Sequence, residues 1–128
     1  MKMSEFLVVG MGGFLGSCLR FGFTKLANQF SFQLPFGTLI SNVLAGLLIG
    51  FIIGIEQQST ALNPHTKLFL TTGFLGGLST FSTFSLETVN LFQEGKIFLA
   101  TGNVALNLAL SLLGVAIGMT CAKLLKKA

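Results

Sequence analysis

The residues best suited to chemistry lie in one short segment, residues 73–85, which reads GFLGGLSTFSTFS. It interleaves five hydroxyl side chains with two phenylalanines, Phe81 and Phe84, inside an otherwise apolar stretch. Hydroxyl groups donate hydrogen bonds, and the edges of phenylalanine rings carry the positive part of the aromatic quadrupole. Because the two rings are three residues apart, they share one face of a helix. This pattern favours contact with an anion; ordinary packing of the rings is the alternative.

Amide side chains form a second candidate set. In the last apolar stretch a polar-to-small stripe follows helical spacings of four, four, three and four: Asn103, Asn107, Ser111, Gly114 and Gly118. Asn42 begins a similar stripe, which Gly46 and Gly50 continue. Amides can replace the water around an anion, and they can also bond one membrane helix to another. The residues alone leave both interpretations open for each asparagine.

Adjacent glycines predict a broken helix in the 73–85 segment, at Gly76 and Gly77. Where a helix breaks inside a membrane, the freed main-chain groups need a partner or an ion. Carbonyl oxygens turned inward suit a hard cation such as sodium.

The ionisable residues, the histidine and the cysteines of the sequence do not form a catalytic group. Arg20 and Glu87 are the ionisable residues nearest the interior of the apolar stretches. An arginine at a mouth raises the local anion concentration, although a snorkelling arginine and an interfacial glutamate are the alternative. The only histidine, His65, is expected in a loop beside Pro64, and no pairing of a nucleophile with a base is visible, so we expect no catalytic group. Cys18 and Cys121 stand alone and are expected to be buried free thiols, with neither a zinc site nor a disulfide.

The elements that must position these residues are membrane helices. Of the 128 residues, 52% are hydrophobic and 9% are charged, against about 25% charged residues in soluble domains. A helix needs about 20 apolar residues to span a bilayer. Four stretches qualify, approximately 6–23, 38–55, 68–92 and 97–125. We predict an all-α integral membrane protein, residues 1–128 forming a single transmembrane domain of four helices with a broken third.

Glycines and charges predict how the helices assemble. Glycines recur four residues apart in every span, for example Gly12 and Gly16, and such rows let helix backbones approach closely. Five basic residues flank the terminal side and three the other side, a weak orientation signal. Two copies inserted in opposite orientations could therefore meet head to tail. Lysines beside membrane spans account for the formal charge of +4, so we expect no nucleic-acid partner.

Taken in order, these motifs resemble those of the Fluc (CrcB-type) fluoride channels across essentially the whole chain. The first span carries GGFLG at residues 12–16, followed by Arg20; the second carries Gly37-Thr38-Leu39 with Asn42 and Gly46; the third carries residues 73–85 with Glu87. The third motif is the most specific of the three. One departure is Phe21, where the family commonly has a tyrosine or tryptophan.

The resemblance implies a dual-topology antiparallel homodimer in the bacterial cell (inner) membrane, with two pores for passive fluoride export. It also implies a central structural sodium ion held by the main-chain oxygens of Gly76 and Ser79. Fluoride would pass Phe81, Phe84 and Asn42. The remaining implied residues are a polar track of Thr38, Ser82, Thr83 and Ser111, and an aqueous vestibule with Arg20 and Glu87.

Two other functions fit parts of the sequence. A small multidrug antiporter also has four short spans, but it needs a carboxylate within the first span, and Glu5 is too near the terminus. A non-transporting membrane scaffold would use the glycine rows and amides only to hold helices together. That interpretation leaves the Phe81 and Phe84 segment unexplained.

Overall fold

The computed structural model describes residues 1–59 and 62–128, and all of its regular secondary structure is helical. Three helices are long and apolar enough to cross a membrane: α1 (Met3–Asn28), α2 (Phe36–Glu56) and α6 (Ile97–Lys127). The third span of the sequence is a succession of shorter helices: α3 (Pro64–Leu68), the π-helix η1 (Phe69–Leu75), α4 (Gly76–Leu78) and α5 (Phe81–Gln93). The predicted all-α membrane fold with an interrupted third helix is confirmed.

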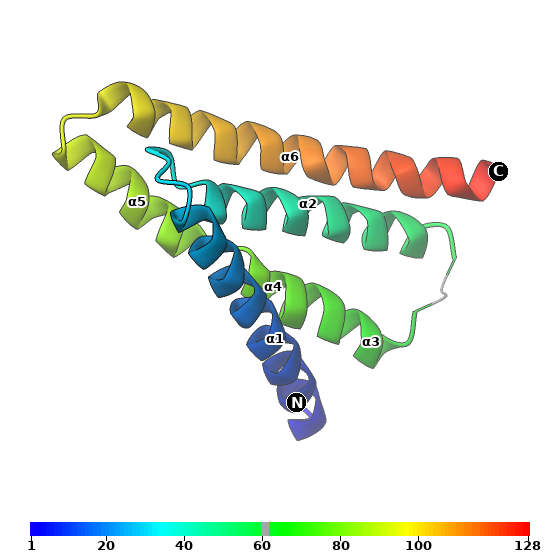
Figure 1. The fold of residues 1–128 in the computed structure, drawn as a ribbon. Helices are drawn as coiled ribbons and strands as arrows, with labels where there is room; N and C mark the ends of the chain where they lie inside the picture. The colour runs from blue at the N-terminus through cyan, green and yellow to red at the C-terminus, as the bar shows by residue number, and fades with distance from the viewer. Residues whose placement is uncertain (60–61) are drawn as a thin grey trace.

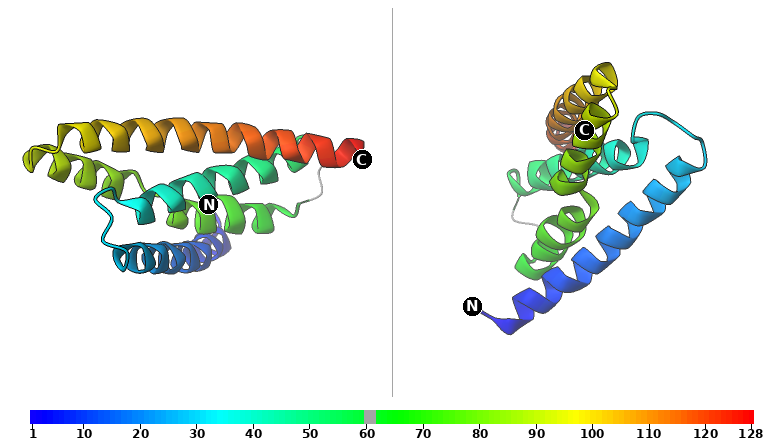
Figure 2. Two further views of the ribbon diagram at one scale, coloured as in Figure 1. Left: turned by 45° about the horizontal axis from the view of Figure 1, so that its top comes forward. Right: turned by 90° about the vertical axis from the view of Figure 1, so that its left-hand side faces the viewer.

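Two helix pairings organise the fold. α6 lies along α2, and α1 crosses obliquely against η1 and α4 (Figure 1). Two further views show α1 and α6 on opposite sides of the fold (Figure 2). Part of the interrupted third span lies against α1. The third span therefore packs against α1 through η1 and α4, and it also contacts α2 and, through α5, α6.

The glycine rows bring the backbones of these pairs into contact. A Cβ atom on Gly118 would meet the carbonyl oxygen of Leu47 across the α2–α6 contact. A Cβ atom on Gly16 would meet the carbonyl oxygen of Phe74 across the contact between α1 and η1. Any larger side chain would force these backbones apart, so the interpretation of the glycine rows as close-packing surfaces is confirmed.

The break in the third span lies two residues beyond the position predicted from the glycines. Gly76 and Gly77 remain helical in α4, whereas Ser79 (φ −79°, ψ 153°) and Thr80 (φ −152°, ψ 124°) are extended. The physical reason is that Gly77 serves packing: a Cβ atom there would lie 2.6 Å from the carbonyl oxygen of Gly13 in α1. A glycine that is needed for close approach can stay within a helix.

Polar contacts fix the ends of the spans, and the thiols point outward. Lys67 Nζ lies 2.7 Å from Glu56 Oε1, which ties α3 to the end of α2. Lys126 Nζ donates to the carbonyl oxygen of Gln58 at 2.8 Å. Cys18 and Cys121 are exposed in the single chain, so the expectation of buried thiols was wrong. They lie on helix faces that the chain itself leaves for lipid or for another subunit.

Candidate functional site

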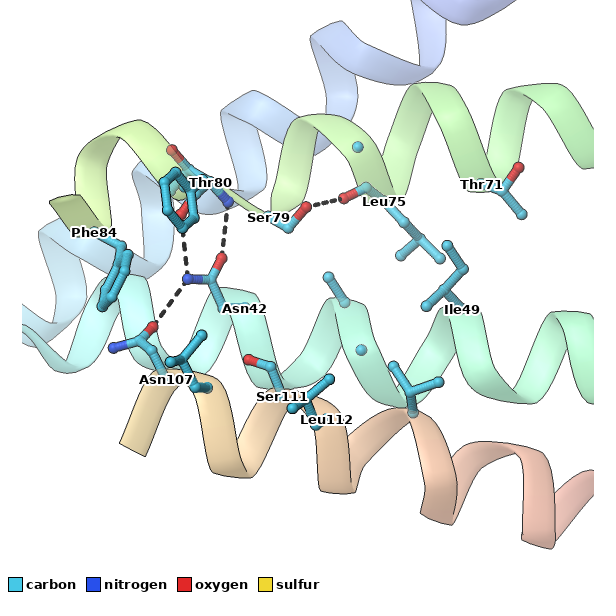
Figure 3. A pocket seen from close by; sticks show the side chains of 16 residues that line it. Asn42, Ile49, Thr71, Leu75, Ser79, Thr80, Phe84, Asn107, Ser111 and Leu112 are labelled. Atoms are coloured by element: carbon cyan, nitrogen blue, oxygen red, sulfur yellow. Dashed lines mark hydrogen bonds between the residues drawn. The ribbon is translucent and has the colours of Figure 1, made fainter. Parts of the chain in front are cut away.

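An open groove of about 410 Å³ runs beside the break, between the third span, α2 and α6 (Figure 3). Its walls are largely apolar, with Ile49, Leu75 and Leu112 among them. Polar groups enter it where the third span is interrupted and from the facing helices: Asn42, Thr71, Ser79, Thr80, Asn107 and Ser111. Phe81 and Phe84 also line it. An apolar groove with a few convergent polar groups is the usual form of a ligand site.

The two phenylalanines lie together, as their spacing predicts, but in different surroundings. Their ring centroids are 5.5 Å apart and their planes are inclined at 55°. Phe84 is 7% exposed, whereas Phe81 is 74% exposed. The chain therefore anchors one ring in its core and leaves the other uncovered at the edge of the groove.

Asn42 holds the broken segment in place. The main-chain N–H of Thr80 donates to Asn42 Oδ1 at 2.8 Å, and Asn42 Nδ2 donates to the Thr80 carbonyl oxygen at 3.2 Å (Figure 3). Nδ2 also donates to Asn107 Oδ1 at 2.9 Å. Both amide hydrogens of Asn42 are thus engaged, so in this arrangement the side chain has none left for an anion. The helix-binding interpretation of Asn42 is the one that its contacts favour.

The break removes the usual helical donors of the carbonyl groups of residues 76–79. In a continuous helix the N–H of residue 80 would bond the Gly76 carbonyl, and that of residue 83 the Ser79 carbonyl. Instead Thr80 N–H donates to Asn42, and Thr83 N–H donates to Thr80 Oγ1 at 3.2 Å. The Gly77 carbonyl accepts from Arg20 Nε at 3.1 Å.

The carbonyl oxygens of Gly76 and Ser79 have therefore lost their usual helical partners, and these are two oxygens that the family resemblance implies as sodium ligands. Neutral carbonyl oxygens are suitable ligands for a hard cation, so the donor set fits. Two oxygens are fewer than such a cation takes, which leaves the set incomplete within one chain.

The two vestibule candidates contact different elements. Arg20 is half-buried and bonds the third span at Gly77. Glu87 Oε1 accepts a hydrogen bond from Thr38 Oγ1 at 2.8 Å, and within the described chain Glu87 Oε2 is buried without a partner. Glu87 also borders a second cavity of about 380 Å³, near Asn90 and Lys96.

The groove takes in only part of the predicted polar track. Ser111 lines it, and its buried Oγ has no hydrogen-bond partner among the described residues. Thr38 bonds Glu87 instead. Thr80 Oγ1 donates to Thr83 Oγ1 at 3.1 Å, and Ser82 Oγ lies 3.4 Å from Thr80 Oγ1, so these hydroxyls form a cluster at the start of α5. Thr38, Ser82 and Thr83 are not among the residues that line the groove.

Sequence reasoning missed the part played by Thr80, whose backbone is the target of Asn42 and whose hydroxyl caps α5. Threonine is a favoured residue immediately before a helix, which could have placed the start of α5 at Phe81. Asn107 was noticed in the polar stripe but was not assigned to the site, where it bonds Asn42.

Comparisons with known proteins agree with the motifs. The family model described as "CrcB-like protein, Camphor Resistance (CrcB)" matches residues 7–119. A relative from Clostridium novyi (strain NT), named fluoride-specific ion channel FluC, is 48% identical over 124 residues, which are 96% of this chain and 97% of the relative. A relative of the same name from Psychrobacter arcticus is 43% identical over 121 residues, 94% of this chain and 98% of the relative.

A third relative of that name, from Clostridium perfringens (strain ATCC 13124), is 49% identical over 125 residues, 97% of this chain and 98% of the relative. These matches cover nearly the full length of each protein, and they include the interrupted third span. Besides that span, the described residues form three long apolar helices. It is therefore a multi-pass membrane protein that belongs to the CrcB family.

Proposed function

We propose that this chain is a fluoride-selective ion channel through which fluoride leaves the cytoplasm passively, and that it is not an enzyme. The observation that carries the proposal is the groove at the break, bordered by Phe81 and Phe84. It occurs in a chain whose near full-length relatives are named fluoride-specific ion channels.

Elementary chemistry gives such a channel a purpose. In an acidic medium fluoride forms hydrogen fluoride, a neutral molecule that crosses lipid and ionises again inside the cell. The trapped anion can leave only if a path replaces its water, and the membrane potential then drives it outward. The ring edges of Phe81 and Phe84 and the unpaired hydroxyl of Ser111 are groups of the right polarity for this exchange.

The working unit is an antiparallel homodimer in the bacterial inner membrane. Its support is the incompleteness of the single chain: the groove is open, and Phe81 is 74% exposed beside it. A second copy would cover Phe81 and supply the opposite wall of each of two pores. The weak charge bias of the sequence is compatible with insertion in both orientations.

The central sodium ion belongs to the same dimer. The Gly76 and Ser79 carbonyl oxygens of two copies would give four ligands, twice the number that one chain offers. A bound cation would offset the negative ends of carbonyl groups that the break leaves without hydrogen-bond donors.

The other assigned residues have supporting roles. Asn42 orients the break through Thr80, whose hydroxyl clusters with those of Ser82 and Thr83. These hydroxyls and Thr38, which bonds Glu87, would form the polar track. Arg20 and Glu87 would face aqueous vestibules, where Arg20 attracts anions.

The alternatives account for less of the structure. The acidic residue of α1, Glu5, lies in the first turn of that helix, far from where an antiporter would need a membrane carboxylate. A scaffold would use the asparagine hydrogen bonds, yet it gives no reason for an exposed Phe81 beside an open groove.

Fluoride efflux tests the proposal directly. Liposomes carrying the purified protein are loaded with fluoride or, for comparison, with chloride, and a potassium ionophore is added so that charge can move. We expect rapid efflux of fluoride, read with a fluoride electrode, and none of chloride. Absence of fluoride efflux from folded, verified dimers would overturn the channel and favour a scaffold or an antiporter.

A further inference from the structure

A continuous series of side-chain hydrogen bonds leaves the groove and returns to the third span. It begins at Asn42, whose Nδ2 donates to Asn107 Oδ1. Asn107 Nδ2 donates to the carbonyl oxygen of Asn103 at 2.9 Å and to Asn103 Oδ1 at 3.0 Å. Asn103 Nδ2 donates to Thr88 Oγ1 at 2.9 Å, and Thr88 Oγ1 donates to the Phe84 carbonyl oxygen at 2.8 Å. The series links α2, α6 and α5.

Each amide in the series has its orientation dictated by its neighbour. Thr80 N–H is a main-chain donor, so Asn42 must turn its oxygen toward Thr80 and its Nδ2 toward Asn107. Asn107 must then present its oxygen to Asn42 and its hydrogens to Asn103. The series ends at Thr88, whose Oγ1 accepts from Asn103 and donates a hydrogen bond to the main-chain carbonyl oxygen of Phe84.

Burial makes this order costly to disturb. Asn103 is fully buried, Asn107 is 4% exposed and Thr88 is 7% exposed. Water cannot replace a missing partner at these positions, so a donor left unpaired carries its full desolvation cost. Thr80 fixes Asn42 at one end of the series, and at the other end Thr88, which does not line the groove, supplies the acceptor for Asn103. Loss of the Thr88 hydroxyl would leave a buried amide unpaired, and the disturbance would reach Asn42 through Asn107.

We propose that Thr88 and Asn103 are positioning residues, which fix Asn42 against the break and Phe84 beside the groove. Their effect on conduction rests on the proposed fluoride channel; their effect on the orientation of Asn42 does not. Neither residue lines the groove, so each acts through its neighbours.

Two substitutions at Thr88 separate positioning from packing. Thr88→Ser keeps the hydroxyl and removes the methyl group, whereas Thr88→Val keeps the shape and removes the hydroxyl. If Thr88 only fills space, Val is the milder change. If Thr88 orders the series, Ser is the milder change, because Ser can still accept from Asn103 and donate to Phe84. The matched control is Thr120→Val in α6, since Thr120 is exposed and donates only to the carbonyl oxygen of Ala116.

The experiment measures fluoride efflux and, separately, the side-chain amide NMR signals of Asn42 and Asn107 in labelled protein in bilayers. We expect Thr88→Val to slow efflux by about tenfold, which is within the range that an unpaired buried donor costs, and to shift both amide signals. Thr88→Ser and Thr120→Val should stay within about twofold, with unshifted signals. Unshifted amide signals in Thr88→Val, or slower efflux in Ser than in Val, would overturn the inference. A native protein without efflux would refute the channel instead, while the amide signals still decide whether Thr88 orients Asn42.

Discussion

Phe81 and Phe84 lie with their ring centroids 5.5 Å apart, yet only Phe84 is covered by its own chain. Exposure of 74% at Phe81 is unremarkable for a residue facing lipid, but this ring lines a groove that also holds polar groups. The polar groups of this groove cannot form hydrogen bonds with lipid tails. We therefore propose that a second subunit and the ion meet at this pair.

Replacement of either ring should stop conduction without unfolding the protein. In Phe81→Ile and in Phe84→Ile, the ring edge is lost while an apolar side chain remains, so we expect fluoride efflux to fall at least about tenfold. Efflux from liposomes measures this, after size-exclusion chromatography has verified the assembly. The control is Phe98→Ile, because Phe98 is 89% exposed at the start of α6 and does not line the groove. Unchanged efflux in both variants would remove the rings from the path.

The close contact of α2 with α6 should not tolerate a single methyl group. Gly118→Ala places a Cβ against the Leu47 carbonyl oxygen, and we expect it to lower the free energy of unfolding by about 1–3 kcal/mol, as overpacking usually does. Gly102→Ala in the same helix meets nothing within 4 Å and should be neutral or stabilising. Unfolding in mixed detergent micelles compares the two variants, and equal stabilities would contradict the packing.

Arg20 carries a positive charge and donates a hydrogen bond to Gly77. The substitution Arg20→Gln removes the charge and keeps a donor. Glutamine can still donate to the Gly77 carbonyl, so the break should persist while the anion-attracting charge is lost. The Debye length is about 30 Å at 0.01 M salt and about 3 Å at 1 M. We expect efflux in the variant to be reduced at low ionic strength and to approach the native rate at high ionic strength. A deficit that does not change with salt would assign Arg20 a purely structural role.

Removal of sodium should destabilise the dimer. A bound ion stabilises the folded state by about 2.7 kcal/mol at 100 times its dissociation constant, so Tm should fall when N-methylglucamine replaces sodium at constant ionic strength. Ser79→Ala is the control: because the main-chain oxygen is the proposed ligand, this variant should retain the sodium dependence. A Tm that is indifferent to sodium would exclude the site at Gly76 and Ser79.

Dual topology should be visible at Lys96. This residue lies between α5 and α6 and pairs with Glu94 at 2.8 Å on the surface. In a Lys96→Cys variant that also lacks Cys18 and Cys121, an impermeant thiol reagent should label about half of the protein from outside intact cells and the rest only after lysis. The dual-topology prediction follows from the weak charge bias. Labelling from one side alone would contradict it.

Much of this architecture could be predicted, because bilayer thickness and the rise of an α-helix together fix how many apolar residues a membrane-spanning helix needs. Stretches of that length can be recognised in the sequence. The break was misplaced because Gly76 and Gly77 were judged by propensity alone, whereas the contact of Gly77 with Gly13 keeps that turn helical. Asn42 was open to two interpretations until its partners were known. Hydrogen-bond partners 38 and 65 residues away decide how its amide is used, and sequence spacing carries no information about them.

The π-helix from Phe69 to Leu75 changes which face of the third span the following residues occupy. Its wider turns, closed by i→i+5 bonds, hold one residue more than the same length of α-helix would. Deleting a residue there would turn everything that follows by about 100° relative to α1, the angle between successive residues of an α-helix. Gly76 and Ser79 would then face a different neighbour. The π-helix thus sets the rotation at which α4 and the break meet α1.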